Sequence, residues 1–123
     1  MGNPLALIIE DDQDLSTIFA RALQSAEFDT EIVENGQTAS KRLNEAAPSV
    51  VVLDLHLPQV SGRDILDQIR TDPRLTETRV MLATADAAMA ETLRSEADLV
   101  LIKPISFSQL RDLAKRLRPL DTG

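Results

Sequence analysis

The sequence predicts a doubly wound α/β fold, in which five β-strands alternate with five helices and form one parallel sheet. Two observations support this class. Short apolar runs recur along the chain, and a segment with the apolar spacing of a helix follows each run. Strands that alternate with helices in this way form a parallel sheet with helices on both faces and right-handed crossovers.

The first strand is expected at residues 5–9, a wholly apolar run of the kind found in strands buried on both faces. A helix is expected next, because apolar residues from Leu15 to Leu23 recur at the spacing of one helical face. A second strand at residues 29–34 ends at Asn35-Gly36. Its low apolar content suits the edge position that the flavodoxin-like strand order 2-1-3-4-5 gives to strand 2.

The second helix is expected to run through Ala39 and Leu43 and to end before Pro48, because a residue that precedes proline disfavours helix. The third strand, at residues 49–54, has the strongest strand pattern in the chain and ends in an acid, Asp54. A loop at residues 56–62 then leads into a third helix, which Asp72-Pro73 should stop.

The last part of the chain repeats the alternation. A fourth strand is expected at residues 80–84, followed by a short alanine-rich helix that Asp86 caps and that reaches about Ser95. A fifth strand is expected at residues 99–103. Ser106 and Gln109 have the spacing of a capping box at the start of the last helix.

Composition restricts the classes of function. A chain of 123 residues with 43% hydrophobic and 27% charged residues suits one folded domain, expected at 1–123 with its core at about 5–118. Without cysteine there is no disulfide or thiolate metal site, and the apolar runs are too short for a membrane span, so we expect a cytoplasmic protein. The net charge of -7 disfavours direct nucleic-acid binding, and four glycines are too few for a glycine-rich phosphate loop.

Polar residues stand at the carboxyl ends of four neighbouring strands: Glu10 and Asp11, Asp54, Thr84, and Lys103. Ligands of open α/β sheets bind at this edge. Three carboxylates together repel one another unless a cation lies between them, and an oxygen-only ligand set suits Mg²⁺. A carboxylate can also act as a nucleophile, with a lysine and a hydroxyl compensating the charge of a phosphoryl group. The set therefore predicts phosphorylation of Asp54.

At these positions the sequence resembles a known family, the receiver domains of two-component response regulators, over about residues 5–118. The four matching motifs are Leu7-Ile8-Ile9-Glu10-Asp11-Asp12, then Val52-Leu53-Asp54-Leu55 together with Leu57-Pro58 and Gly62, then Thr84-Ala85, and last Lys103-Pro104. Each motif is weak alone, but four in the right order on the expected strands are specific.

The resemblance implies a signalling switch, which catalyses only its own phosphotransfer and autodephosphorylation. Asp54 would accept phosphate from a histidine kinase or a phosphotransfer protein, and Mg²⁺ would be held by Glu10, Asp11, Asp54 and the backbone carbonyl of His56. Thr84 and Lys103 would bind phosphoryl oxygens, and Thr84 would relay the change to the surface formed by the fourth helix, fifth strand and fifth helix. The family also implies a cis bond before Pro104 and a possible homodimer through that surface.

One departure from the family pattern bears on how the switch works. Three residues before the lysine, response regulators usually have Tyr or Phe, whose ring rotates on activation, whereas this sequence has Val100. The read-out of the switch is therefore open, and a receiver-like docking module that does not use phosphate is one alternative. The other is a Mg²⁺-dependent phosphatase of the haloacid-dehalogenase type, although His56 occupies the position where those enzymes have a second Asp.

Several charged residues have simpler interpretations. Asp12 and Asp14 suit the N-terminal end of a helix and are placed outside the site. His56 is the only histidine, which disfavours a transition-metal site. The last helix has four basic residues that suit a solvated face, with an interaction surface as the alternative: Arg111, Lys115, Arg116 and Arg118.

Overall fold

The computed structural model of the protein describes residues 2–57 and 59–119, which form a five-stranded sheet and five α-helices. The strands are β1 (Leu5–Ile9), β2 (Asp29–Val33), β3 (Val50–Asp54), β4 (Arg79–Thr84) and β5 (Leu99–Ile102). The helices are α1 (Gln13–Ser25), α2 (Gly36–Glu45), α3 (Gly62–Thr71), α4 (Ala87–Leu93) and α5 (Phe107–Leu117). Pro58 of the Leu57-Pro58 match lies outside the described residues, as do the two ends of the expected domain, residues 1 and 120–123.

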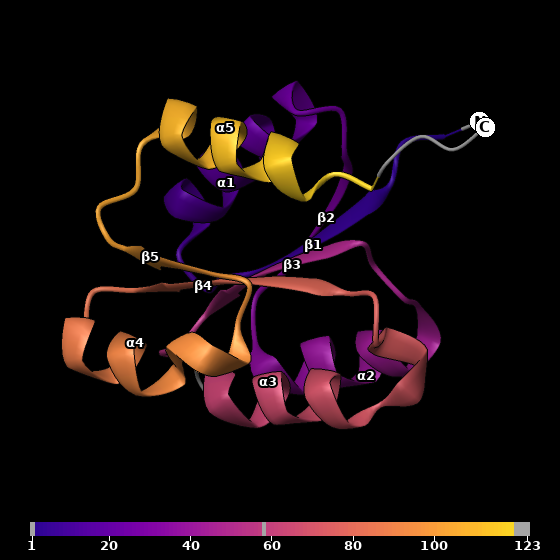
Figure 1. Ribbon diagram of the computed structural model, residues 1–123, viewed down its shortest axis with the longest axis vertical. Coiled ribbons are helices and arrows are strands. Elements are labelled where there is room, and N and C mark those ends of the chain that lie inside the picture. Colours follow the sequence, from indigo (N-terminus) through magenta and orange to yellow (C-terminus); the bar gives the residue numbers. More distant parts are fainter. Residues whose placement is uncertain (1, 58, 120–123) are drawn as a thin grey trace.

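The strands pair in the order β2-β1-β3-β4-β5, and every pair is parallel, which confirms the predicted topology. The register places Ile9 beside Leu53 and Leu53 beside Leu82, so β1, β3 and β4 end at a common edge. Figure 1 shows α1 and α5 on one face of the sheet and α2, α3 and α4 on the other.

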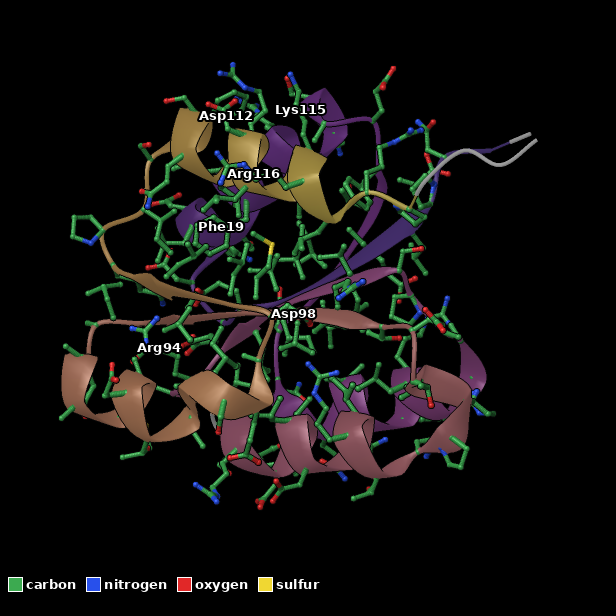
Figure 2. All side chains as sticks on the ribbon, viewed as in Figure 1. Phe19, Arg94, Asp98, Asp112, Lys115 and Arg116 are labelled. Carbon is green, nitrogen blue, oxygen red and sulfur yellow. The ribbon has the colours of Figure 1, made fainter. Side chains whose placement is uncertain are left out.

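The core consists of two apolar layers, one on each face of the sheet. Ala6 and Ile8 face the layer beneath α1 and α5, whereas Leu7 and Ile9 face the layer beneath α2, α3 and α4. This alternation explains why β1 is apolar throughout, because both of its faces are buried. Phe19 of α1 fills the first layer, where its side chain lies between helix and sheet (Figure 2).

Short polar side chains define where the α-helices begin. The residue before each helix accepts a hydrogen bond from the backbone amide three positions later, which satisfies an amide that the helix itself leaves unpaired. These residues are Asp12, Asn35, Ser61, Asp86 and Ser106. Asp12 therefore has the helix-terminal role expected of it.

The bounds of β2, β3, β4 and β5 each differ from the expected ranges by one residue, and two larger differences concern the segments after α3 and α4. A 3₁₀ helix, Pro73–Leu75, follows α3, because Asp72 caps a new turn at the proline that ends the α-helix. Helix α4 ends at Leu93 instead of Ser95, and the chain continues as a 3₁₀ turn over Arg94–Glu96. Both segments are single turns, which apolar periodicity does not register. Within the described parts of the chain, no helix combines the length and apolar content needed to cross a membrane.

Gly62, the first residue of α3, packs directly on the end of β3. A β-carbon at this position would lie 2.5 Å from the backbone oxygen of Asp54 and 2.6 Å from Cα of Leu55. Because both neighbours are backbone atoms, we expect Gly62→Ala to lower the free energy of unfolding by about 1–3 kcal/mol, as measured by urea denaturation. Ser108→Ala, at an exposed position of α5, is the control, and an equal effect of both substitutions would contradict the prediction.

Candidate functional site

Three carboxylates meet at the carboxyl edge of the sheet. Oxygens of Glu10, Asp11 and Asp54 all lie within 4.8 Å of one another. Glu10 and Asp54 are only 2% and 3% exposed, whereas Asp11 is open to solvent. The structure thus brings together the three acids that the sequence placed at the ends of the first and third strands, and an oxygen-only set of this kind fits a hard divalent cation such as Mg²⁺.

Lys103 places an ammonium group against two of these acids. Its Nζ lies 3.0 Å from Oε1 of Glu10 and 3.5 Å from Oδ1 of Asp54. The backbone amide of Lys103 donates to the carbonyl of Thr84, which holds the end of β5 beside β4. The Lys103–Pro104 bond is cis, as the resemblance implied. Burial alone would lower the pKa of Lys103, but the hydrogen bond to Glu10 and the nearby Asp54 carboxylate raise the pKa overall.

Glu10 has an unusual protonation equilibrium. The pKa of Glu10 is raised to about 7, mainly by burial; the hydrogen bond from Lys103 opposes this rise, and the neighbouring Asp54 carboxylate contributes to it. The single positive charge of Lys103 thus does not neutralise the negative charge of the carboxylates in this cluster. A shortage of positive charge in an all-oxygen cluster is the condition in which a divalent cation binds well.

Backbone amides orient the two buried carboxylates. The amide of His56 donates to Oδ1 of Asp54 at 3.0 Å, and the amide of Asp12 donates to Oε2 of Glu10 at 3.3 Å. The His56 side chain is exposed at the rim of the site. These bonds fix both acids without consuming any other ionised side chain.

Thr84 ends β4 and is completely buried. Its hydroxyl oxygen accepts a hydrogen bond from the backbone amide of Asp86 at 3.0 Å, so this oxygen is directed towards the start of α4. Among the described residues, no side-chain hydrogen bond joins Thr84 to Asp54 or Lys103. Val100 is half-buried and packs against the apolar layer beneath α2, α3 and α4.

The comparisons with known proteins identify the family. The family model for the response regulator receiver domain matches residues 6–115. The chain belongs to this family. Receiver domains are signalling switches and not conventional enzymes, and the match leaves the haloacid-dehalogenase alternative without support.

Similar proteins cover nearly the whole receiver domain. The transcriptional regulatory protein TrcR of Mycobacterium tuberculosis is 34% identical over 97% of this chain and 46% of its own length. The chemotaxis response regulator CheY4 of Vibrio cholerae has a TM-score of 0.85 at 19% identity, over 94% of this chain and 98% of CheY4, which shows the shared fold. TrrA from Thermotoga maritima, in a crystal structure with Mg²⁺–BeF, has a TM-score of 0.81 at 25% identity, over 93% and 98% of the two chains.

The receiver domain spans about a fifth to a half of the length of the curated relatives that it matches. Those relatives include regulators of transcription, as their names state. The ligands that these longer proteins bind through their other segments are properties of those proteins and are not assigned to this domain.

The basic residues of the last helix lie outside the site. Lys115 and Arg116 are exposed on α5, where Figure 2 shows them together with Asp112. Arg111 pairs with Asp112, and Arg118 donates to the backbone of Glu27. A hollow lined in part by Arg79 and Arg116 lies at the amino ends of β3 and β4, at the opposite edge of the sheet from the three carboxylates.

Asp86 is the residue near the site that sequence analysis did not connect to it. The sequence predicted Asp86 as the cap of α4, which the structure confirms, but gave no link to Thr84. The two-residue spacing between Thr84 and Asp86 could have indicated this hydrogen bond, because threonine hydroxyls often accept a hydrogen bond from the amide two positions later.

Proposed function

We propose that this receiver domain is a phosphorylation switch, in which Asp54 accepts a phosphoryl group from a histidine kinase or a phosphotransfer protein in a Mg²⁺-dependent reaction. One observation supports the proposal above all. Three carboxylates, Glu10, Asp11 and Asp54, lie within 4.8 Å of one another, and the Lys103 ammonium contacts the two buried ones.

In the proposed reaction, a carboxylate oxygen of Asp54 attacks phosphorus while the bond from phosphorus to the donor breaks. The electron pair of that bond leaves with the donor, which is a phosphohistidine nitrogen or the oxygen of acetyl phosphate. Lys103 is positioned to compensate charge on the phosphoryl oxygens, and the Thr84 hydroxyl would donate to one of them. Glu10, Asp11, Asp54 and the His56 carbonyl would hold Mg²⁺, which would neutralise negative charge as donor and acceptor approach.

The output of the switch also belongs to the proposal. Phosphorylation would alter the surface of α4, β5 and α5, and a homodimer through this surface is one form of output. Slow autodephosphorylation would return Asp54 to its free state. The proposal places the protein in the cytoplasm and includes no direct contact with nucleic acid by this domain, whose net charge is -7.

The test uses acetyl phosphate and Mg²⁺ with intact-mass spectrometry. We expect one phosphoryl adduct on the wild type, none on Asp54→Asn, and none when a chelator removes Mg²⁺. Asp112→Asn, at an exposed position on α5, is the matched control and should retain the adduct. The absence of an adduct on the wild type, or its persistence on Asp54→Asn, would overturn the proposal.

Val100 favours a second candidate, a docking module that signals without phosphate. The two candidates differ in how the protein responds once Asp54 is phosphorylated. If the adduct forms but changes neither the oligomeric state nor the amide NMR shifts of β5 and α5, the docking module is the better description.

A further inference from the structure

A hollow of about 730 Å³ lies at the amino edge of the sheet, at the end opposite to the three carboxylates. Helix α5 runs back from the carboxyl edge to this edge, so its last residues lie near the segments that enter β3 and β4 (Figure 1). These three parts of the chain line the hollow. Small-molecule sites in proteins commonly have volumes of about 300–1,000 Å³, so the hollow has the size of a ligand site.

The lining of the hollow is positively charged, although the protein is acidic. Three of the chain's 13 basic residues line it, but only one of its 20 acidic residues does, Glu77. The basic residues are Arg79 at the start of β4 and Arg116 and Arg118 at the end of α5. Cations near the C-terminal end of a helix compensate the negative end of its dipole, which accounts for the two arginines of α5. The dipole gives no reason for a third guanidinium group that comes from a strand.

Two of the three guanidinium groups are held in place and still have unused donors. Nη1 of Arg79 lies 3.1 Å from a carboxylate oxygen of Asp98. Nε of Arg118 donates to the backbone carbonyl of Glu27 at 3.4 Å. A guanidinium group has five N–H donors, so these contacts leave most of them for a ligand. Asp98 also pairs with Arg70, so its single negative charge is shared between two arginines.

Arg116 and Ser49 add donors that have no partner in the described part of the chain. Arg116 is exposed and forms no ion pair or side-chain hydrogen bond with a described residue. The Ser49 hydroxyl likewise has no partner there, because this residue is bonded through its backbone alone. Guanidinium groups bind phosphate through paired hydrogen bonds, and a hydroxyl can add another donor. Leu117 and Pro119 give the same hollow an apolar part, which suits the organic portion of a ligand.

We propose that this hollow binds a small organic phosphate of about the size of a nucleotide, with its phosphate groups on Arg79, Arg116 and Arg118. The volume favours such a molecule over inorganic phosphate, which would fill only a small part of the hollow. A long polyanion such as nucleic acid is disfavoured, because beyond the hollow it would meet a surface with an excess of acids. The proposal does not depend on Asp54, and it gives the domain a second input at the opposite edge of the sheet.

The first experiment titrates the full chain with ADP in the absence of Mg²⁺ and measures binding by calorimetry. We expect one ADP per chain, and about tenfold weaker binding to Arg116→Gln, which loses one hydrogen bond to a charged group. Arg94→Gln removes the same charge from an exposed position after α4 and is the matched control, with the affinity of the wild type. The absence of binding at millimolar ADP, or an equal loss of affinity in both variants, would overturn the proposal.

Two further probes test the chemistry of the ligand. Citrate is an organic anion without phosphate, and inorganic phosphate has no organic portion. We expect each to bind about tenfold more weakly than ADP. If citrate binds as tightly as ADP, the hollow does not select phosphate, and if inorganic phosphate does so, the apolar part of the lining makes no contact. Either result would contradict the proposal.

Amide NMR shifts then locate the bound ADP. The amides of Ser49, Arg79 and Leu117 should shift, whereas those of Asp54 and Lys103 should not. Shifts confined to the carboxyl edge would place ADP at the site of the proposed phosphorylation and would overturn the second site. The adduct on Asp54 is a separate measurement with acetyl phosphate, so the failure of either proposal leaves the other standing.

Discussion

Lys103→Gln is expected to slow the phosphorylation of Asp54 by about 100-fold, because removal of one group that stabilises developing charge has an effect of this order in the active sites of enzymes. The glutamine amide can still donate a hydrogen bond, but it has no charge to compensate the phosphoryl oxygens. The rate is measured as the growth of the phosphoryl adduct with acetyl phosphate and Mg²⁺, in protein whose folding has been verified by circular dichroism.

Lys115→Gln is the matched control for this prediction, since it removes the same charge from an exposed position on α5. The overall net charge is then equal in the two variants, and a difference in rate reports the position of the lysine. If both variants react at the same rate, the contact of Lys103 with Glu10 and Asp54 has no role in the reaction.

Glu10→Gln is expected to stabilise the protein at pH 8 in the absence of Mg²⁺, by an amount on the order of 3 kcal/mol. Folding raises the pKa of Glu10 from 4.5 to about 7, mainly through burial. Below pH 4.5 the side chain is protonated in both the folded and the unfolded protein. Above pH 7 it is ionised in both, so the folded protein contains an unfavourable charge and the free energy of unfolding falls as pH rises between these values.

Urea denaturation at several pH values tests this prediction. The advantage of Glu10→Gln should be small at pH 5 and should grow towards pH 8, and Mg²⁺ should stabilise the wild type more than the variant. Glu34→Gln, an exposed substitution on the loop after β2, should show no comparable pH dependence. A stability difference between variant and wild type that is constant from pH 5 to pH 8 would show that the effect does not come from ionisation of Glu10.

The sequence predicted the fold well because the information needed was local and apolar. Every strand except β2 had a continuous apolar run, and the polar residue that ended the run marked the edge of the core. The ends of the first and third strands therefore predicted the approach of Glu10, Asp11 and Asp54 before any distance was known.

The finer contacts of the site were not predictable in the same way. Lys103 lies closer to Glu10 than to Asp54, a choice that depends on how a long side chain crosses the end of β4. The bond between Thr84 and Asp86 depends on the path of a short loop. Apolar periodicity describes which residues face the core, and it contains no information on the directions of polar groups in loops.

The division of the core into two layers has a consequence for the energetics of partner binding. The sheet separates the layer beneath α1 and α5 from the layer beneath α2, α3 and α4. Substitutions in different layers, such as Leu23→Ala and Leu66→Ala, should therefore have nearly additive effects on stability. Helices α4 and α5 lie on opposite faces beside the edge strand β5 (Figure 1). The affinity of a partner that contacts both helices would therefore depend on the position of one layer relative to the other.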